Sequence, residues 1–157
     1  MTGPPAGGPA PELEALDLLK IHQLLGYYGH VVDDQDWDRF DELFTPDATL
    51  DYTRAGAPGL LHGIEEIRAF FRDTNHPSAH HVVNIVVTQQ GGEVRVRSKF
   101  FAPYTRDTHT PKRWKGGTYD DVVVLTEAGW RFAFRACIGR WQFTTDEEPI
   151  PQQQRTW

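Results

Sequence analysis

The chain has 157 residues, of which 39% are hydrophobic and 12% aromatic, so its length and composition suit one domain with a buried core. Its formal net charge of −6 argues against nucleic acid and against an anionic membrane surface as partners, because both attract basic faces. No stretch approaches the roughly 20 consecutive apolar residues of a membrane span, and the N-terminus lacks the basic and apolar regions of a signal peptide. We therefore expect a soluble, cytoplasmic protein.

The two ends of the chain differ in composition from its middle. Residues 1–11 hold four prolines and three glycines, which is typical of a disordered arm. Residues 145–157 are rich in polar residues and proline, and we expect a C-terminal tail there. Residues 12–144 then form a single domain. Its one cysteine, Cys137, excludes an internal disulfide and lies in an apolar strand pattern, which favours a small core residue.

The first half of the domain shows helical spacing of its apolar residues. A helix over residues 13–32 is predicted because its apolar positions step by three and four: Leu18, Ile21, Leu25, Tyr28 and Val32. A short helix follows Asp36, a short strand contains Leu50 and Tyr52 on one face, and another helix begins near Gly63.

After residue 80 the hydrophobic period changes to two, which is typical of strands. Four strands are predicted, over residues 80–90, 93–104, 117–126 and 130–141. The inward set of the first is His81, Val83, Ile85 and Val87, and that of the last is Trp130, Phe132, Phe134, Ala136 and Ile138. The same alternation puts His80 and Asn84 on the outer face unless a bulge intervenes. Helices followed by antiparallel strands predict an α+β fold: a cone-shaped barrel of a strongly curved, mostly antiparallel sheet packed on N-terminal helices, with an internal pocket.

Asp33 lies at the shoulder of the first predicted helix, on the side of Gly26 and Gly29. A carboxylate there is costly unless a partner pairs with it, although a solvated aspartate at a helix end is the simpler alternative. Histidines are the candidate partners, and the inward set of its strand favours His81. A metal site of His76, His80 and His81 is a further alternative, but no HExxH, HxH or cysteine pair is present, so we expect no metal.

Several tyrosines fall on faces that alternation marks as inward. They are Tyr28, Tyr52 and Tyr104, while Tyr119 alternates with Asp121 and one of these two is expected to reach the cavity. Plain core packing explains any single buried tyrosine, but several phenols around one cavity favour a substrate site.

Five segments together resemble the SnoaL-like group of the nuclear transport factor 2-like superfamily: "YGHVVDDQDWDRFDELFTPDATLDY", "HGIEEIRAFF", "AHHVVN", "GGTYDD" and "GWRFAFRACIGRW". The resemblance runs from about Leu16 to Phe143. It is strongest to the scytalone dehydratases, with steroid isomerases and bile acid dehydratases nearby, and it implies a cone-shaped fold around a pocket.

The resemblance also implies roles for single residues. It matches Asp33 and His81 to the catalytic dyad of the dehydratases, Tyr52 to a substrate-holding tyrosine, and Tyr28 to a tyrosine used in the bile acid relatives. Tyr104 stands where scytalone dehydratase has a second catalytic histidine, so scytalone itself is not expected to be the substrate.

These observations predict a cofactor-independent lyase or isomerase: a dehydratase, isomerase or cyclase that uses general acid/base chemistry on a polyketide-like or other hydrophobic carbonyl compound, in secondary metabolism. The catalytic candidates are Asp33, His81 and Tyr28, and the substrate-binding candidates are Tyr52, Tyr104, Tyr119, Asn84 and Asp121. Two alternatives remain: a non-catalytic protein that binds a small hydrophobic ligand, and a small structural subunit of a ring-hydroxylating oxygenase. Because the family forms dimers and trimers, we expect a homodimer or homotrimer.

Overall fold

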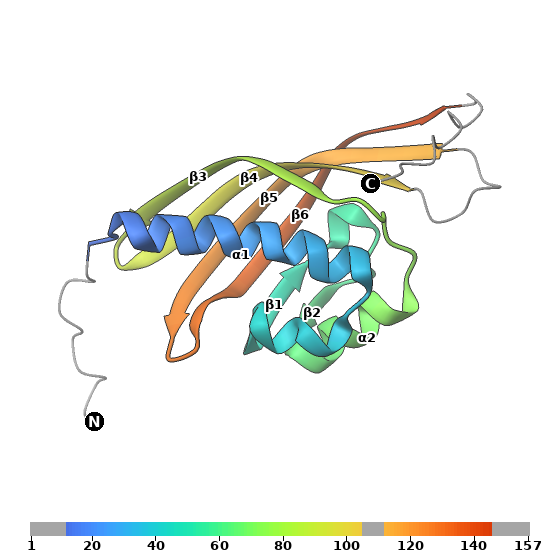
Figure 1. Cartoon of the computed structure of the whole chain (residues 1–157). Coiled ribbons are helices and arrows are strands. Elements are labelled where there is room, and N and C mark those ends of the chain that lie inside the picture. Colours follow the sequence, from blue (N-terminus) through green and yellow to red (C-terminus); the bar gives the residue numbers. More distant parts are fainter. Residues whose placement is uncertain (1–11, 105–111, 146–157) are drawn as a thin grey trace, which may run out of the picture.

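The computed structural model describes residues 12–104 and 112–145 and contains helices packed on one sheet (Figure 1). In chain order the elements are α1 (Ala15–Asp34), the 3₁₀ helix η1 (Trp37–Glu42), β1 (Phe44–Asp51), the 3₁₀ helix η2 (Thr53–Ala55), β2 (Leu60–His62), α2 (Ile64–Asp73), β3 (His81–Gln90), β4 (Glu93–Tyr104), β5 (Lys112–Thr126) and β6 (Gly129–Thr145). The arm predicted over residues 1–11, and residues 146–157 of the predicted tail, lie outside the described residues. Of the helices described, none is both long enough and apolar enough to cross a membrane.

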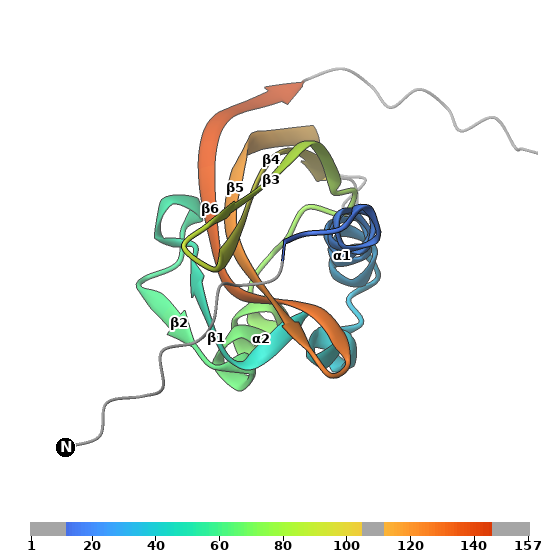
Figure 2. The same ribbon diagram turned by 90° about the vertical axis from the view of Figure 1, so that its left-hand side faces the viewer.

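The sheet has six strands in the order β2-β1-β6-β5-β4-β3. All neighbouring strands pair antiparallel except β1 and β6, which run parallel. The sheet curves strongly, with α1 lying along its concave side and α2 close to β1 and β2 (Figures 1 and 2). The predicted α+β fold with a curved, mostly antiparallel sheet on N-terminal helices is confirmed, although the sheet remains open between its β2 and β3 edges.

Helix α1 buries the apolar stripe that its sequence predicts, with one exception. Its buried side chains include Ile21, Leu25, Tyr28 and Val32, whereas Leu18 is 39% exposed. The helix begins with a reciprocal capping box between Glu14 and Asp17, and it ends where Gln35 adopts a left-handed conformation with φ of 57°. The buried stripe packs the C-terminal half of α1 against the sheet. This packing fixes where the end of α1 lies relative to β3 and β6.

A β-bulge in β3 reverses the direction of the side chains before it. Val83 pairs with Lys99 and Val86 pairs with Arg97, so β3 contains one residue more than β4 between these pairs. Asn84 lies in this bulge with a φ of 51°. Because side chains alternate with a period of two, one extra residue moves the whole preceding segment to the opposite face from the one predicted.

A second irregularity lies in β6 and has the same effect. Val122 pairs with Phe134 but Val123 pairs with Phe132, so β6 contains the additional residue. The predicted inward positions Trp130 and Phe132 are buried. Further along the strand Arg135, which the alternation places on the other face, is completely buried (0% exposed), and Cys137 is buried (5% exposed), as its apolar surroundings indicate. The predicted alternation is therefore wrong for Arg135, whose side chain enters the interior.

Candidate active site

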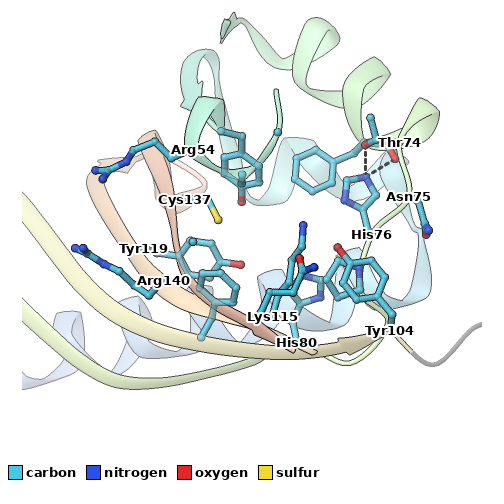
Figure 3. Close-up of a pocket in the computed structure, with 18 of the residues that line it drawn as sticks. Arg54, Thr74, Asn75, His76, His80, Tyr104, Lys115, Tyr119, Cys137 and Arg140 are labelled. Atoms are coloured by element: carbon cyan, nitrogen blue, oxygen red, sulfur yellow. Dashed lines mark hydrogen bonds between the residues drawn. The ribbon is translucent and has the colours of Figure 1, made fainter. Parts of the chain in front are cut away.

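A cavity of about 530 Å³ opens beside the concave face of the sheet, between the C-terminal half of α1, α2 and the strands β4 to β6 (Figure 3). Phe70, Phe71 and Phe100 form apolar parts of its wall. The polar and charged side chains that line it are Tyr28, Tyr52, Tyr104, Tyr119, Thr74, Asn75, His76, His80, Arg54, Lys115, Arg140 and Gln142. A cavity of this volume that combines apolar walls with polar groups suits a small organic molecule.

Asp33 holds His80 in place through two hydrogen bonds. The ring Nδ1 of His80 lies 2.6 Å from Asp33 Oδ1, and the His80 backbone N–H donates to Asp33 Oδ2 at 2.8 Å. The side chain of His80 is 6% exposed and that of Asp33 is 22% exposed. A carboxylate can only accept, so Nδ1 carries the hydrogen and Nε2 carries the lone pair of the neutral ring. His80 lines the cavity, and its Nε2 is the ring nitrogen that can take up a proton.

The predicted contact between Asp33 and His81 is wrong. His81 lies exposed on the outer face of the sheet, where its ring stacks on Phe101 at a centroid distance of 4.4 Å. The substrate-binding candidate Asn84 is also exposed. The bulge at Asn84 is the physical cause, because it turns His80 toward α1 and His81 away from it. Asn84 itself was the available signal, since asparagine tolerates positive φ better than most residues do.

Close packing of α1 against the segment before β3 depends on Gly29. A β-carbon added to Gly29 would lie 3.2 Å from the backbone oxygen of His80, which is closer than ordinary contact. Asp33 lies one helical turn further along α1, so this approach brings its carboxylate within reach of His80. Gly26 has no such neighbour, because a β-carbon there would meet nothing within 4 Å.

We expect Gly29→Val to lower the free energy of unfolding by about 1–3 kcal/mol, since the new side chain must push His80 away from α1. Gly26→Val is the matched control and should change it by less than about 0.5 kcal/mol, because valine fits a helix slightly better than glycine and meets no obstacle there. Urea unfolding followed by circular dichroism measures both values. Equal effects of the two substitutions would contradict the role assigned to Gly29.

Neutral phenols gather on one side of the cavity. The hydroxyl groups of Tyr28 and Tyr52 are 2.7 Å apart and buried. Burial raises the pKa of Tyr52 and of Tyr119 well above the usual value for tyrosine. It also raises the pKa of Tyr28, where the opposing effect of Arg135 is smaller. The phenols are therefore protonated at physiological pH and can donate hydrogen bonds to a bound molecule.

Asp121 does not line the cavity, in contrast to its predicted role in substrate binding. It accepts two hydrogen bonds of 2.8 Å from Arg135, and both side chains are completely buried. The guanidinium carbon lies 4.1 Å and 4.3 Å from the ring centroids of Tyr28 and Tyr119. Burial works against the charge of Arg135, but the Asp121 carboxylate raises its pKa above the ordinary value for arginine. The Arg135–Asp121 ion pair therefore packs against two tyrosines of the cavity wall without lining the cavity itself.

The comparison with known families decides the classification. The model of the SnoaL-like domain matches residues 13–136, most of the described structure. The chain belongs to the SnoaL-like family. An uncharacterised protein of Mycobacterium tuberculosis is 32% identical over 126 residues, which cover 78% of this chain and 84% of that protein.

Solved structures resemble this SnoaL-like protein over most of its length. A Novosphingobium aromaticivorans protein with the provisional name aromatic ring hydroxylase is 27% identical, with a TM-score of 0.73 over 85% of this chain and 96% of the other. Another protein of that organism, provisionally named scytalone dehydratase, is 20% identical, with a TM-score of 0.70 over 88% and 96% of the two chains. This second likeness shows the fold alone. The family match over residues 13–136 confirms the resemblance seen in the sequence.

The histidines of this SnoaL-like domain do not converge as the metal alternative would require. His76 stacks on Phe71, and its Nε2 lies 2.7 Å from the hydroxyl of Thr74. His81 points to the other side of the sheet from His80. In the ranges 12–104 and 112–145, no three His, Cys, Asp or Glu side chains gather closely enough to hold a metal ion.

Cys137 lines the cavity although the sequence indicates only a core position. Burial raises the pKa of its thiol to about 12, so the thiol is protonated at physiological pH. A protonated thiol is a poor nucleophile, so Cys137 is not poised for nucleophilic attack.

Proposed function

We propose that this SnoaL-like protein is a cofactor-independent enzyme in which His80, held by Asp33, transfers a proton on a hydrophobic carbonyl compound. The reaction is a dehydration, an isomerisation or a cyclisation, because all three can start with removal of a proton next to a carbonyl. The hydrogen-bonded pair of Asp33 and His80 at the wall of a cavity is the observation that carries the proposal. Neutral phenols in the same cavity support it.

In the proposed mechanism, Nε2 of His80 removes the proton from the carbon next to the carbonyl. Asp33 stabilises the imidazolium that forms and keeps the ring oriented. Tyr52 or Tyr119 donates a hydrogen bond to the developing enolate oxygen, while Tyr28 orients Tyr52 through their hydroxyl contact. The imidazolium then returns its proton to a departing hydroxyl group, to another carbon, or to the oxygen formed on ring closure.

A deuterium-exchange experiment tests this proposal without knowledge of the natural substrate. The protein is incubated in D₂O with α-tetralone and a panel of aromatic β-hydroxy ketones, and proton NMR follows exchange at the carbon next to the carbonyl and loss of water. We expect exchange or turnover above the buffer rate, by roughly 10²–10⁴-fold for a positioned base. Binding of the panel with neither exchange nor turnover would contradict the proposal and support a ligand carrier instead.

A second candidate is the small subunit of a ring-hydroxylating oxygenase. The provisional name of the Novosphingobium neighbour, aromatic ring hydroxylase, supports it. A structural subunit has no need of a histidine held by a carboxylate on a cavity wall, which is why we rank it second. It predicts that the isolated chain exchanges no protons in the D₂O experiment and that His80→Ala has no effect on any activity of an assembled complex.

A further inference from the structure

The charge of the cavity is opposite to the charge of the protein. The chain has 22 acidic and 16 basic residues, a net charge of −6. Its cavity is lined by three cations, Arg54, Lys115 and Arg140, and no Asp or Glu belongs to the described lining. A cationic cavity in an acidic protein requires an explanation beyond general solubility.

Among the described residues, no acid pairs with the three cations of the cavity. Elsewhere in these ranges arginines do pair with carboxylates, as Arg39 does with Asp36 and Arg135 with Asp121. Within residues 12–104 and 112–145, Arg54, Lys115 and Arg140 make no such pair. No carboxylate of these two ranges therefore neutralises their charges.

We propose that the cavity takes an anionic substrate, an aromatic or polyketide-like carbonyl compound whose carboxylate is bound by Lys115. This inference rests on the proposed function, because it names the substrate class of the same site. A lysine supplies a compact positive charge with three hydrogen-bond donors, which suits a carboxylate.

The position of Lys115 suits this arrangement. Lys115 reaches into the cavity from β5, and its ammonium nitrogen lies 5.7 Å from the ring centroid of Tyr104 (Figure 3). Arg54 and Arg140 lie on adjacent segments of η2 and β6 at the other edge of the cavity, and their guanidinium groups point away from Lys115 (Figure 3). A carboxylate held by Lys115 would fix the substrate in the cavity that His80 also lines, which a purely apolar cavity could not do.

A pair of fluorescent dyes tests the inference independently of turnover. Anilinonaphthalene sulfonate is anionic, and N-phenylnaphthylamine has the same aromatic framework without the sulfonate. We expect the anionic dye to bind more tightly. Lys115→Gln should weaken its binding about tenfold and that of the neutral dye less than about twofold, because only the anion loses a charge-assisted hydrogen bond.

Lys20→Gln is the matched control, since Lys20 is exposed on α1 outside the cavity lining and its loss changes the net charge equally. It should leave both affinities unchanged. Equal binding of the two dyes, no binding of the anionic dye, or equal weakening of both dyes by Lys115→Gln would overturn the inference.

The two proposals fail in different ways. His80→Ala should retain the preference for the anionic dye, because it removes the base and leaves the cations. Proton exchange on neutral ketones without any anion preference would overturn the substrate class only. A clear anion preference in a protein that exchanges no protons would overturn the proposed enzyme only.

Discussion

His80→Ala is expected to lower turnover of any ketone that the wild-type protein converts by at least about 10²-fold, because it removes the group that takes up the proton. Asp33→Asn should be similarly harmful although it preserves size. The asparagine amide group can donate to Nδ1, which moves the ring hydrogen to Nε2 and leaves no lone pair there. Initial rates measured by NMR or absorbance, with circular dichroism to check folding, provide the comparison.

His81→Ala is the matched control for this prediction. It changes the neighbouring histidine, which lies exposed on the outer face and stacks on Phe101. Turnover should remain within about twofold of the wild-type value, since surface substitutions away from a site have small effects. Loss of turnover in His81→Ala with normal turnover in His80→Ala would contradict the assignment and favour the pairing predicted from sequence alone.

Asp121→Asn is expected to produce the largest loss of stability, about 3–5 kcal/mol in the free energy of unfolding. The substitution leaves the guanidinium of Arg135 charged and completely buried without a counter-charge. Urea unfolding measures the effect. The double variant Asp121→Leu/Arg135→Met should recover most of the loss found for Asp121→Leu alone, because removing both charges also removes the cost of burying them.

Asp120→Asn is the appropriate control, because Asp120 precedes Asp121 in β5 but lies on the solvent side. Its contact with Arg97 is 3.6 Å long, and the two side chains are 67% (Arg97) and 43% (Asp120) exposed. Exposed pairs contribute roughly 0–1 kcal/mol, so the control should change stability by less than that. A loss in Asp121→Asn no larger than in Asp120→Asn would show that the buried pair does not hold the core together.

The candidate site was predictable where it depends on helical periodicity and on single strands without irregularities. Tyr28 lies in the apolar stripe of α1, and Tyr104 belongs to the set of β4 residues predicted to face inward. Both tyrosines line the cavity. Asp33 was correctly suspected because a carboxylate at a helix shoulder requires a partner. The partner itself was misassigned by one residue, since the alternation was extended backward from Ile85 across the bulge at Asn84.

The charged side chains of the interior were less accessible to prediction. Arg135 occupies a position that simple alternation assigns to the outer face, and an arginine in a strand is usually exposed. The cations of the cavity come from η2, β5 and β6, which are far apart in the sequence. No local pattern indicates that Arg54, Lys115 and Arg140 surround the same space.

By itself, the sequence determined the α+β class, the order of the longer helices and strands, the amphipathic face of α1 and the family, because these follow from local periodicity and from motifs carried along the chain. It gave no sign of the short elements η2 and β2. Only the tertiary structure decided which histidine meets Asp33, where Arg135 goes and which cations share the cavity. The physical reason is that a single inserted residue in a strand reverses the direction of every side chain before it. Whether such a bulge is stable depends on how the chain packs against α1 and the neighbouring strand, which no local pattern in the sequence records.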